Sequence, residues 1–353
     1  MNFPEVPDSI TAQPLIELLR GLPVRDLHGN LQCGVTGIAE HSALVSEGGL
    51  FVACPGEKTH GRNFVNEAFE RGARIVCTET PLDLPAGMTQ VRVSGISRVK
   101  HQIAQRFYDF PQYDLDLIGI IGSEQRTPVS SIAHFLLDNW FNPTGLLNAE
   151  VCDFGRTLRA AELTTPEPCD LYRLLREMIA YERRCVVMEI TTQGLLRQRV
   201  RGLGFHVLAF TDHRFERDAA DEWTNVLTLK EQALARGWDH GPSDIVVINR
   251  NDPVSSKLLC MVPTAIDTVT YGIDVCANIR AENLLKTPLG WQFDLLWEGG
   301  RVQTLFPIKG PKKKVLEALG ALAIAYAYGR NLYEMAALLP DYSESSSGQL
   351  HLL

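Results

Sequence analysis

Four almost continuously apolar runs in the later two thirds of the chain constrain its fold most strongly. The runs are residues 115–121, "CVVMEI" 185–190, "HVLAFT" 206–211 and "DIVVIN" 244–249. Stretches with helical spacing lie between several of them, for example over residues 229–237. Strands that are apolar at nearly every position are typical of parallel strands that helices cover on both faces. The alternation therefore predicts a doubly wound α/β domain over residues 113–353.

Residues 1–112 predict a smaller α/β domain that precedes it. "GGLFVACPG" and "RIVCTE" are typical of short strands, and "NFVNEAFERGA" has helical spacing that ends at Gly72. A helix over "RVKHQIAQRFYDFP" would stop at Pro111, which places the expected boundary near residue 112. A length of 353 residues fits two such domains.

Composition and charge exclude several classes of function. The net charge is −8 and no long basic run is present, which argues against nucleic acid as a partner. The N-terminal stretch lacks a signal pattern, and no apolar run approaches the roughly 20 residues of a membrane span. The eight cysteines form no C-x-x-C pair, so we expect reduced core residues in a cytoplasmic protein.

The segment "IGIIGSEQRTPVSS" has the strand, loop and helix context of a phosphate-binding loop, with the helix expected to begin at Ser130. Such a loop needs glycines near the phosphate, a lysine that reaches it and a hydroxyl for Mg²⁺. Gly119, Gly122 and Thr127 are in place, but Gln125 stands where a glycine belongs and Arg126 replaces the lysine. Two interpretations remain, namely the remnant of a nucleotide loop and a plain turn that binds no phosphate.

Other polar residues follow the predicted strands. Glu189 ends one of them, at the sheet edge that faces ligands in open α/β folds, so it is either a Mg²⁺ ligand or an exposed acid. Thr164 and Thr165 precede a proline that opens a helix, where they would cap the helix or contact a phosphate or sugar. The segment 212–216 is a candidate metal site or a loose acidic loop.

Taken in order, these segments resemble the Mur ligase family, and most closely its MurE type, the UDP-MurNAc-tripeptide synthetases. The resemblance rests on "GGLFVACPGEKTHGR", "LIGIIGSEQRTPVSS", "ELTTPEPCDLYRLL", "VMEITTQGLLRQRV", "FTDHRFERD" and "VVINRNDP". It implies a small N-terminal UDP-binding-like domain and a P-loop-type, ATPase-like central domain. It also implies a cytoplasmic, ATP- and Mg²⁺-dependent addition of an amino acid to a UDP-MurNAc-peptide.

The resemblance also assigns roles to single residues. Glu189 corresponds to a metal ligand, and Lys230 to a lysine that the family carbamylates. The loop remnant comprises Gly119, Gly122, Arg126 and Thr127. The expected contacts to the UDP-MurNAc-peptide are Ser42, Lys58, Thr59, Thr164, Thr165, Thr191, Thr192 and Arg199.

Departures from the family pattern determine the functional hypothesis. Arg126 replaces the loop lysine, Glu216-Arg217 replaces a metal-binding Asp-His, and the family's third domain is not expected in this chain. We therefore expect a degenerate pseudo-ligase that binds a UDP-MurNAc-peptide-like ligand, or a protein partner or second copy at an exposed C-terminal joint. The alternatives are an active ligase completed by a separate third domain, with Arg126 and Lys230 as catalytic candidates, and a scaffold without a small ligand.

Overall fold

The computed structural model describes residues 11–56, 59–138, 142–155, 157–212 and 245–343. The chain divides into two compact units. The first unit comprises Met1–Asp114 with Pro166–Ala180, and the second comprises Leu115–Thr165 with Tyr181–Leu353. The segment 166–180 therefore belongs to the first unit, whereas the predicted boundary at residue 112 places it in the second domain.

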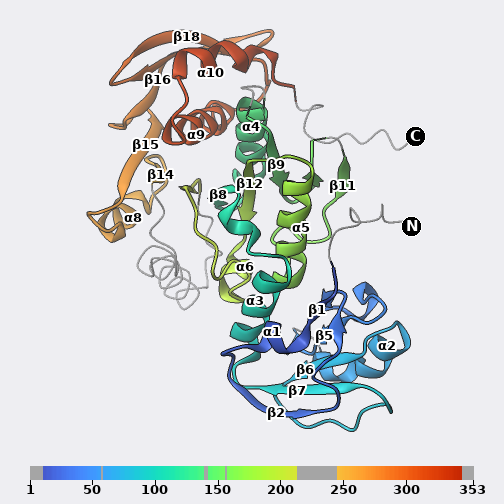
Figure 1. The fold of residues 1–353 in the computed structure, drawn as a ribbon. Helices are drawn as coiled ribbons and strands as arrows, with labels where there is room; N and C mark the ends of the chain where they lie inside the picture. The colour runs from blue at the N-terminus through green and yellow to red at the C-terminus, as the bar shows by residue number, and fades with distance from the viewer. Residues whose placement is uncertain (1–10, 57–58, 139–141, 156, 213–244, 344–353) are drawn as a thin grey trace. The chain divides into compact units, whose positions relative to one another are not determined.

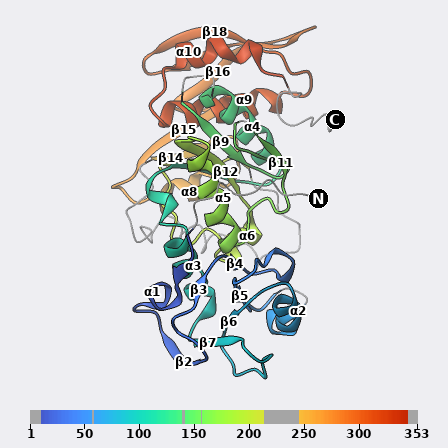
Figure 2. The same cartoon turned by 45° about the vertical axis from the view of Figure 1, so that its right-hand side comes forward.

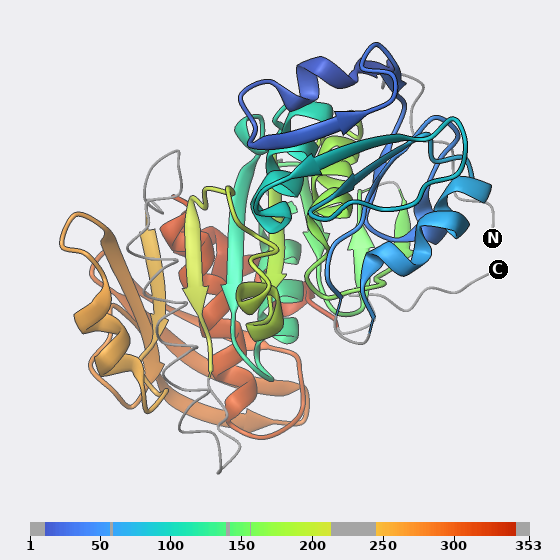
Figure 3. The same ribbon diagram turned by 90° about the horizontal axis from the view of Figure 1, so that it is seen from below.

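The first unit is built on a five-stranded sheet with the order β2-β7-β6-β5-β4, drawn in blue and cyan in Figure 3. Strands β4 to β7 are parallel and β2 is antiparallel to β7. A separate two-stranded sheet pairs β1 with β3. The strands are β1 (Gln13–Pro14), β2 (Val24–His28), β3 (Gly34–Val35), β4 (Ile38–Ala39), β5 (Leu50–Val52), β6 (Ile75–Thr78) and β7 (Thr89–Val93).

Helix α5 (Pro168–Ala180) belongs to the first unit because it packs against a helix of that unit. Leu171, Tyr172 and Leu175 are buried, and α5 packs against α3 (Ile96–Phe107). Gln105 of α3 donates a hydrogen bond to the Tyr172 hydroxyl at 2.8 Å. The remaining helices and turns of this unit are α1 (Leu15–Leu19), η1 (Ser42–Leu44), η2 (Gly61–Phe64), α2 (Val65–Glu70) and η3 (Pro111–Tyr113).

The second unit contains an eleven-stranded sheet with the order β11-β10-β9-β12-β8-β13-β14-β15-β16-β17-β18. Its centre, from β9 to β16, is parallel, and both ends are antiparallel. The strands are β8 (Asp116–Ile121), β9 (Thr144–Leu147), β10 (Val151–Asp153), β11 (Leu158–Ala160), β12 (Cys185–Ile190), β13 (Val207–Phe210), β14 (Ile245–Asn249), β15 (Asp267–Ile273), β16 (Ile279–Thr287), β17 (Gly290–Trp297) and β18 (Gly300–Phe306). The predicted α/β class is confirmed.

Two long helices pack together beside the parallel centre of this sheet. Helix α9 (Lys313–Ala327) is buried along almost its whole length and contacts α4 (Arg126–Asp138), β14 and β15 (Figure 1). Helix α10 (Leu332–Leu338) packs against β18 (Figure 2). The other helices are α6 (Thr192–Leu196), α8 (Ser255–Met261) and η4 (Leu339–Asp341).

The helix expected from Ser130 begins earlier, at Arg126. Pro128 is compatible with this start because a proline in the first helical turn removes an N–H that needs no partner within the helix. A helix expected over residues 229–237 lies outside the described residues. Within the described part of the chain, no helix has both the length and the apolar character needed to cross a membrane.

Candidate nucleotide loop and substrate residues

The loop between β8 and α4 consists of residues 122–125. Gly122 is required at its start, because a Cβ atom there would lie 1.9 Å from the Thr211 hydroxyl oxygen. Gly119, which the sequence placed in the loop remnant, lies inside β8 instead. A Cβ atom on Gly119 would lie 2.7 Å from the Ile190 side chain and 2.9 Å from the Phe205 ring, so this glycine serves packing.

Three consecutive backbone amides of this loop converge on one carboxylate. The N–H groups of Ser123, Glu124 and Gln125 donate to the Asp212 carboxylate oxygens at 3.1, 3.0 and 3.0 Å. Converging backbone N–H groups at a helix N-terminus form an anion-binding concavity. The loop therefore keeps an anion-binding shape despite the side chain of Gln125, and the anion that it holds belongs to the chain itself.

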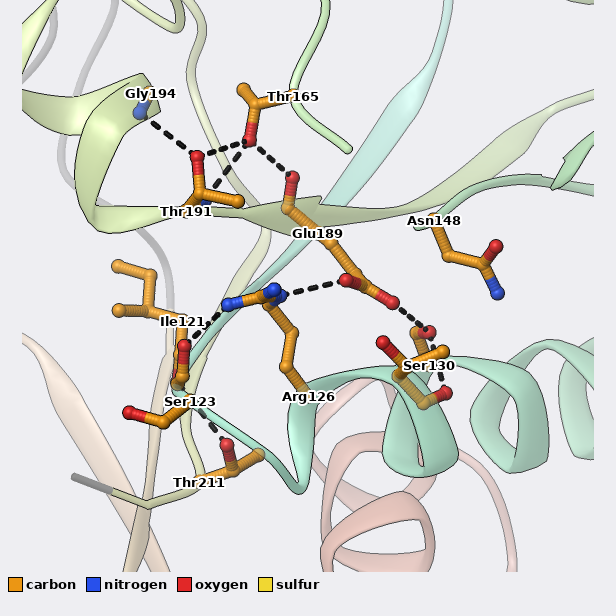
Figure 4. Close-up of polar contacts among 12 residues, drawn as sticks. Ile121, Ser123, Arg126, Ser130, Asn148, Thr165, Glu189, Thr191, Gly194 and Thr211 are labelled. Atoms are coloured by element: carbon orange, nitrogen blue, oxygen red, sulfur yellow. Dashed lines mark hydrogen bonds and ion pairs between the residues drawn. The ribbon is translucent and has the colours of Figure 1, made fainter. Parts of the chain in front are cut away.

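Arg126 points from the start of α4 towards Glu189 at the end of β12 (Figure 4). Its Nε atom lies 2.6 Å from Glu189 Oε2, and its Nη1 atom donates to the carbonyl of Gly122 at 2.5 Å. The Glu189 side chain is fully buried and that of Arg126 is 14% exposed. A buried carboxylate requires such a partner, because an isolated charge is costly to desolvate.

Ser130 completes the environment of Glu189, a role that sequence reasoning missed. Its hydroxyl lies 3.0 Å from Glu189 Oε1 and 2.9 Å from the Thr127 carbonyl. Ser130 follows Arg126 by four residues, so both lie on one face of α4. The sequence prediction began the helix at Ser130, which left Arg126 outside it. The four-residue spacing places Arg126 and Ser130 on one helix face only because α4 begins at Arg126.

The donors around Glu189 decide whether the described residues fit a Mg²⁺ ion. Both carboxylate oxygens already have a partner, and one of these partners is a guanidinium cation. Mg²⁺ requires free oxygen ligands and is repelled by a cation at this distance. The described conformation therefore does not fit Mg²⁺ at Glu189. Among the described residues, no group of three or more His, Cys, Asp or Glu side chains is arranged to hold a metal ion.

The threonines predicted to contact substrate lie beside the end of β12. Thr165 is fully buried, and its hydroxyl interacts with the Glu189 carbonyl, the Thr191 N–H and the Thr191 hydroxyl at 3.1, 2.9 and 3.1 Å. Thr191 caps α6 through the N–H of Gly194. The structure brings these two hydroxyls together as a structural cluster. Thr164 is partly exposed and Thr192 is exposed, so both are accessible to a ligand.

Arg199 has a structural contact where the resemblance implies a substrate contact. It is 8% exposed, and its Nη1 atom donates to the Thr165 carbonyl at 3.0 Å. The guanidinium thereby holds the segment that carries Thr165. In the described conformation, its burial leaves little surface for an acidic peptide.

The remaining predicted residues lie in the first unit or outside the described residues. Ser42 is 4% exposed at the start of η1, and Thr59 is exposed. Lys58 and Lys230 lie outside the described residues, as do His213 and Glu216 of the candidate metal site. Ser42 and Thr59 belong to a different unit from Thr165 and Thr191.

Replacing Gly122 by alanine should destabilise the second unit by about 1–3 kcal/mol, as overpacking does. The new methyl group would clash with the Thr211 hydroxyl, and Thr211 is 1% exposed, so it has little room to move. Trp291 and Trp297 lie on β17 of the second unit, so tryptophan fluorescence during urea unfolding reports on it. The double variant Gly122→Ala/Thr211→Ala should recover most of the loss, with Thr211→Ala alone as control. An equal loss in the double variant would disprove the proposed clash.

Comparisons with known proteins agree with this architecture. "Mur ligase family, catalytic domain" matches residues 34–108 and "Mur ligase middle domain" matches residues 120–325. The UDP-N-acetylmuramoyl-L-alanyl-D-glutamate--2,6-diaminopimelate ligase of Geobacillus kaustophilus is 30% identical over 331 residues, which cover 93% of this chain and 67% of that protein. The corresponding L-lysine ligase of Staphylococcus haemolyticus is 26% identical, with 96% of this chain and 68% of that protein covered.

Solved structures show the same fold. A UDP-N-acetylmuramoyl-L-alanyl-D-glutamate--2,6-diaminopimelate ligase superposes with a TM-score of 0.75 at 17% identity, covering 94% of this chain and 67% of that chain. MurF from Acinetobacter baumannii superposes with a TM-score of 0.68 at 18% identity, with the same coverage. The chain thus spans about two thirds of the length of these proteins. Together with the matched segments, these similarities show that the chain belongs to the Mur ligase family.

Proposed function

We propose that this chain binds a UDP-MurNAc-peptide-like ligand and, with its loop in the described conformation, does not carry out ATP-dependent ligation by itself. Support for the ligand comes from the relatives, whose names are those of ligases acting on UDP-N-acetylmuramoyl peptides. Support for the missing chemistry comes from the nucleotide loop. The substrate, the absence of ligation and any partner or second copy of the chain are all parts of this proposal.

The observation that carries the proposal is the buried pair of Arg126 and Glu189. Charge stabilisation by a metal ion and a positioned cation is the main contribution of a protein to phosphoryl chemistry. Here the cation neutralises the carboxylate that would serve the metal, at 2.6 Å and with the Glu189 side chain fully buried. Neither group is then available to a nucleotide unless the pair opens.

The second candidate is an active ATP-dependent amide ligase of the Mur type. At the level of the family, the comparisons support this candidate better than the degenerate one, because the relatives reported above are named as ligases. It requires the Arg126–Glu189 pair to separate when substrates bind. The residue that the family carbamylates corresponds to Lys230, which stays a catalytic candidate under this proposal.

Calorimetry with UDP-MurNAc-dipeptide and an ADP-release assay separate the two candidates. The assay contains the full chain, UDP-MurNAc-dipeptide, Mg²⁺, ATP and either lysine or diaminopimelate. We expect heat of binding with the dipeptide ligand and no ADP release above the rate without protein. ADP release that requires all substrates together would replace the first candidate by the second.

A threonine substitution tests the ligand contact directly. Thr59→Ala should weaken binding of UDP-MurNAc-dipeptide about five- to tenfold, since a lost hydrogen bond is worth about 1 kcal/mol. Ser97→Ala is a matched control, because Ser97 is an exposed hydroxyl residue of the same unit and on α3. Absence of binding by the unaltered chain would refute the proposed ligand, whatever the assay for ADP shows.

A further inference from the structure

We propose that Asp212 is a specificity-determining residue of the nucleotide loop, because its carboxylate occupies the position of a phosphate group and excludes one. The inference rests on the proposed function in one respect, since it takes residues 122–125 to be the family's nucleotide loop. It goes further by naming the group that decides whether a polyphosphate can bind there.

The hydrogen bonds show that carboxylate and phosphate would compete for the same donors. Asp212 Oδ1 accepts from the amides of Ser123 and Gln125, and Oδ2 accepts from the amide of Glu124. The Thr211 hydroxyl supplies a further bond to Oδ1 at 3.1 Å. A phosphate would have to take over these three amides, and the carboxylate would have to leave them first.

The position of Asp212 is determined by the sheet and not by a chance contact of its side chain. It lies two residues after the end of β13, whose last residues pair with the end of β8. The Thr211 N–H donates to the Ile121 carbonyl at 3.0 Å, and the buried Asn249 amide donates to the Thr211 carbonyl at 2.6 Å. Both sides of the backbone before Asp212 are thus held, which directs the carboxylate at the loop.

The charges around the loop disfavour a polyphosphate for a second reason. Burial raises the pKa of the Tyr271 hydroxyl, and the nearby negative charges of Asp212, Asp252 and Glu317 raise it further. Among the described residues, the cations near the loop are paired, since Arg126 contacts Glu189 and Lys313 lies 3.6 Å from Glu124. A polyphosphate would enter a region in which the Asp212 carboxylate already adds negative charge at the loop amides.

The test is binding of tripolyphosphate and of ATP to the full chain and to Asp212→Asn, measured by calorimetry without the sugar ligand. Asparagine has nearly the same shape but no charge, so phosphate should displace it more readily from the backbone amides of residues 123–125. We expect at least tenfold tighter binding of both probes to Asp212→Asn than to the unaltered chain. Asp267→Asn is the control for net charge, because Asp267 is exposed at the start of β15 in the same unit.

Hydrogen exchange at the amides of residues 123–125 provides an independent measurement. These amides should exchange slowly in the unaltered chain and faster in Asp212→Asn, and tripolyphosphate should restore their protection in the variant. Asp212→Ser serves if the asparagine variant does not fold, as judged by tryptophan fluorescence. Equal affinity of both proteins for tripolyphosphate, or no binding by either, would overturn the proposal. Both results are independent of whether UDP-MurNAc-dipeptide binds.

Discussion

Replacing Arg126 by alanine should lower the free energy of unfolding of the second unit by about 3 kcal/mol or more. Removing one partner of a buried ion pair leaves an uncompensated charge, which typically costs about 3–5 kcal/mol. Glu189 is the partner left behind, and it is fully buried with only the Ser130 hydroxyl as a remaining side-chain donor in the described structure. Urea unfolding followed by tryptophan fluorescence measures the effect.

Two further variants establish that the charge of Glu189 causes the loss. Arg126→Ala/Glu189→Gln should be at least 2 kcal/mol more stable than Arg126→Ala, because the glutamine carries no charge. Arg183→Ala is a matched control. Arg183 is buried to a similar degree, but its partner Asp138 is 37% exposed at 3.5 Å, so the loss should be about 1 kcal/mol. Equal losses of stability in the single and double variants would show that the Glu189 charge does not cause the loss.

The variant Lys100→Met should destabilise the first unit, and the loss should be larger at pH 8 than at pH 5. Lys100 lies 2.6 Å from Glu40 and 3.4 Å from Glu167, and its side chain is 7% exposed. Burial raises the pKa of the Glu40 carboxyl, and the Lys100 charge opposes this effect. Without Lys100 the pKa of Glu40 rises further, so stability is retained below its unfolded pKa near 4.5 and is lost as the pH rises through the folded pKa.

We expect a loss of about 3 kcal/mol at pH 8 and at least 1 kcal/mol less at pH 5. Because the first unit contains no tryptophan, hydrogen exchange of the central strands β5 and β6 is the suitable measurement. Lys100→Met/Glu40→Gln should recover stability at pH 8. Arg71→Met removes an exposed pair with Glu67 and should cost less than about 1 kcal/mol at either pH. A loss independent of pH would contradict the role of Glu40.

In the second unit, the sequence predicted β8, β12, β13 and β14, whose side chains are almost all buried. The run 185–190 coincides with β12, in which all six residues are buried. The strands β16 to β18 were missed because they form an antiparallel ribbon with mixed burial. In β16 the buried and exposed positions do not alternate regularly, and a register shift interrupts its pairing with β17. Neither periodicity nor apolar content identifies such a strand.

Only those parts of the candidate site that residues close together in the sequence form could be predicted. The turn from β8 into α4 and the position of Glu189 at the end of β12 followed from local pattern. The contact of Asp212 with the loop joins residues 87–89 positions apart, and no local pattern indicates it. For the same reason, Arg126 was expected to face a ligand and not Glu189.

The assignment of α5 to the first unit has a consequence for how the protein is made. Domains fold as units while the ribosome synthesises the chain from the N-terminus. The first unit needs α5, because the Cys169 N–H donates to the buried Glu40 and Glu167 contacts Lys100. Its core is therefore incomplete until residue 180 has been synthesised, after β8 to β11 of the second unit. A fragment that ends at residue 114 would expose the face of α3 that α5 covers, so expression fragments should not divide the chain there.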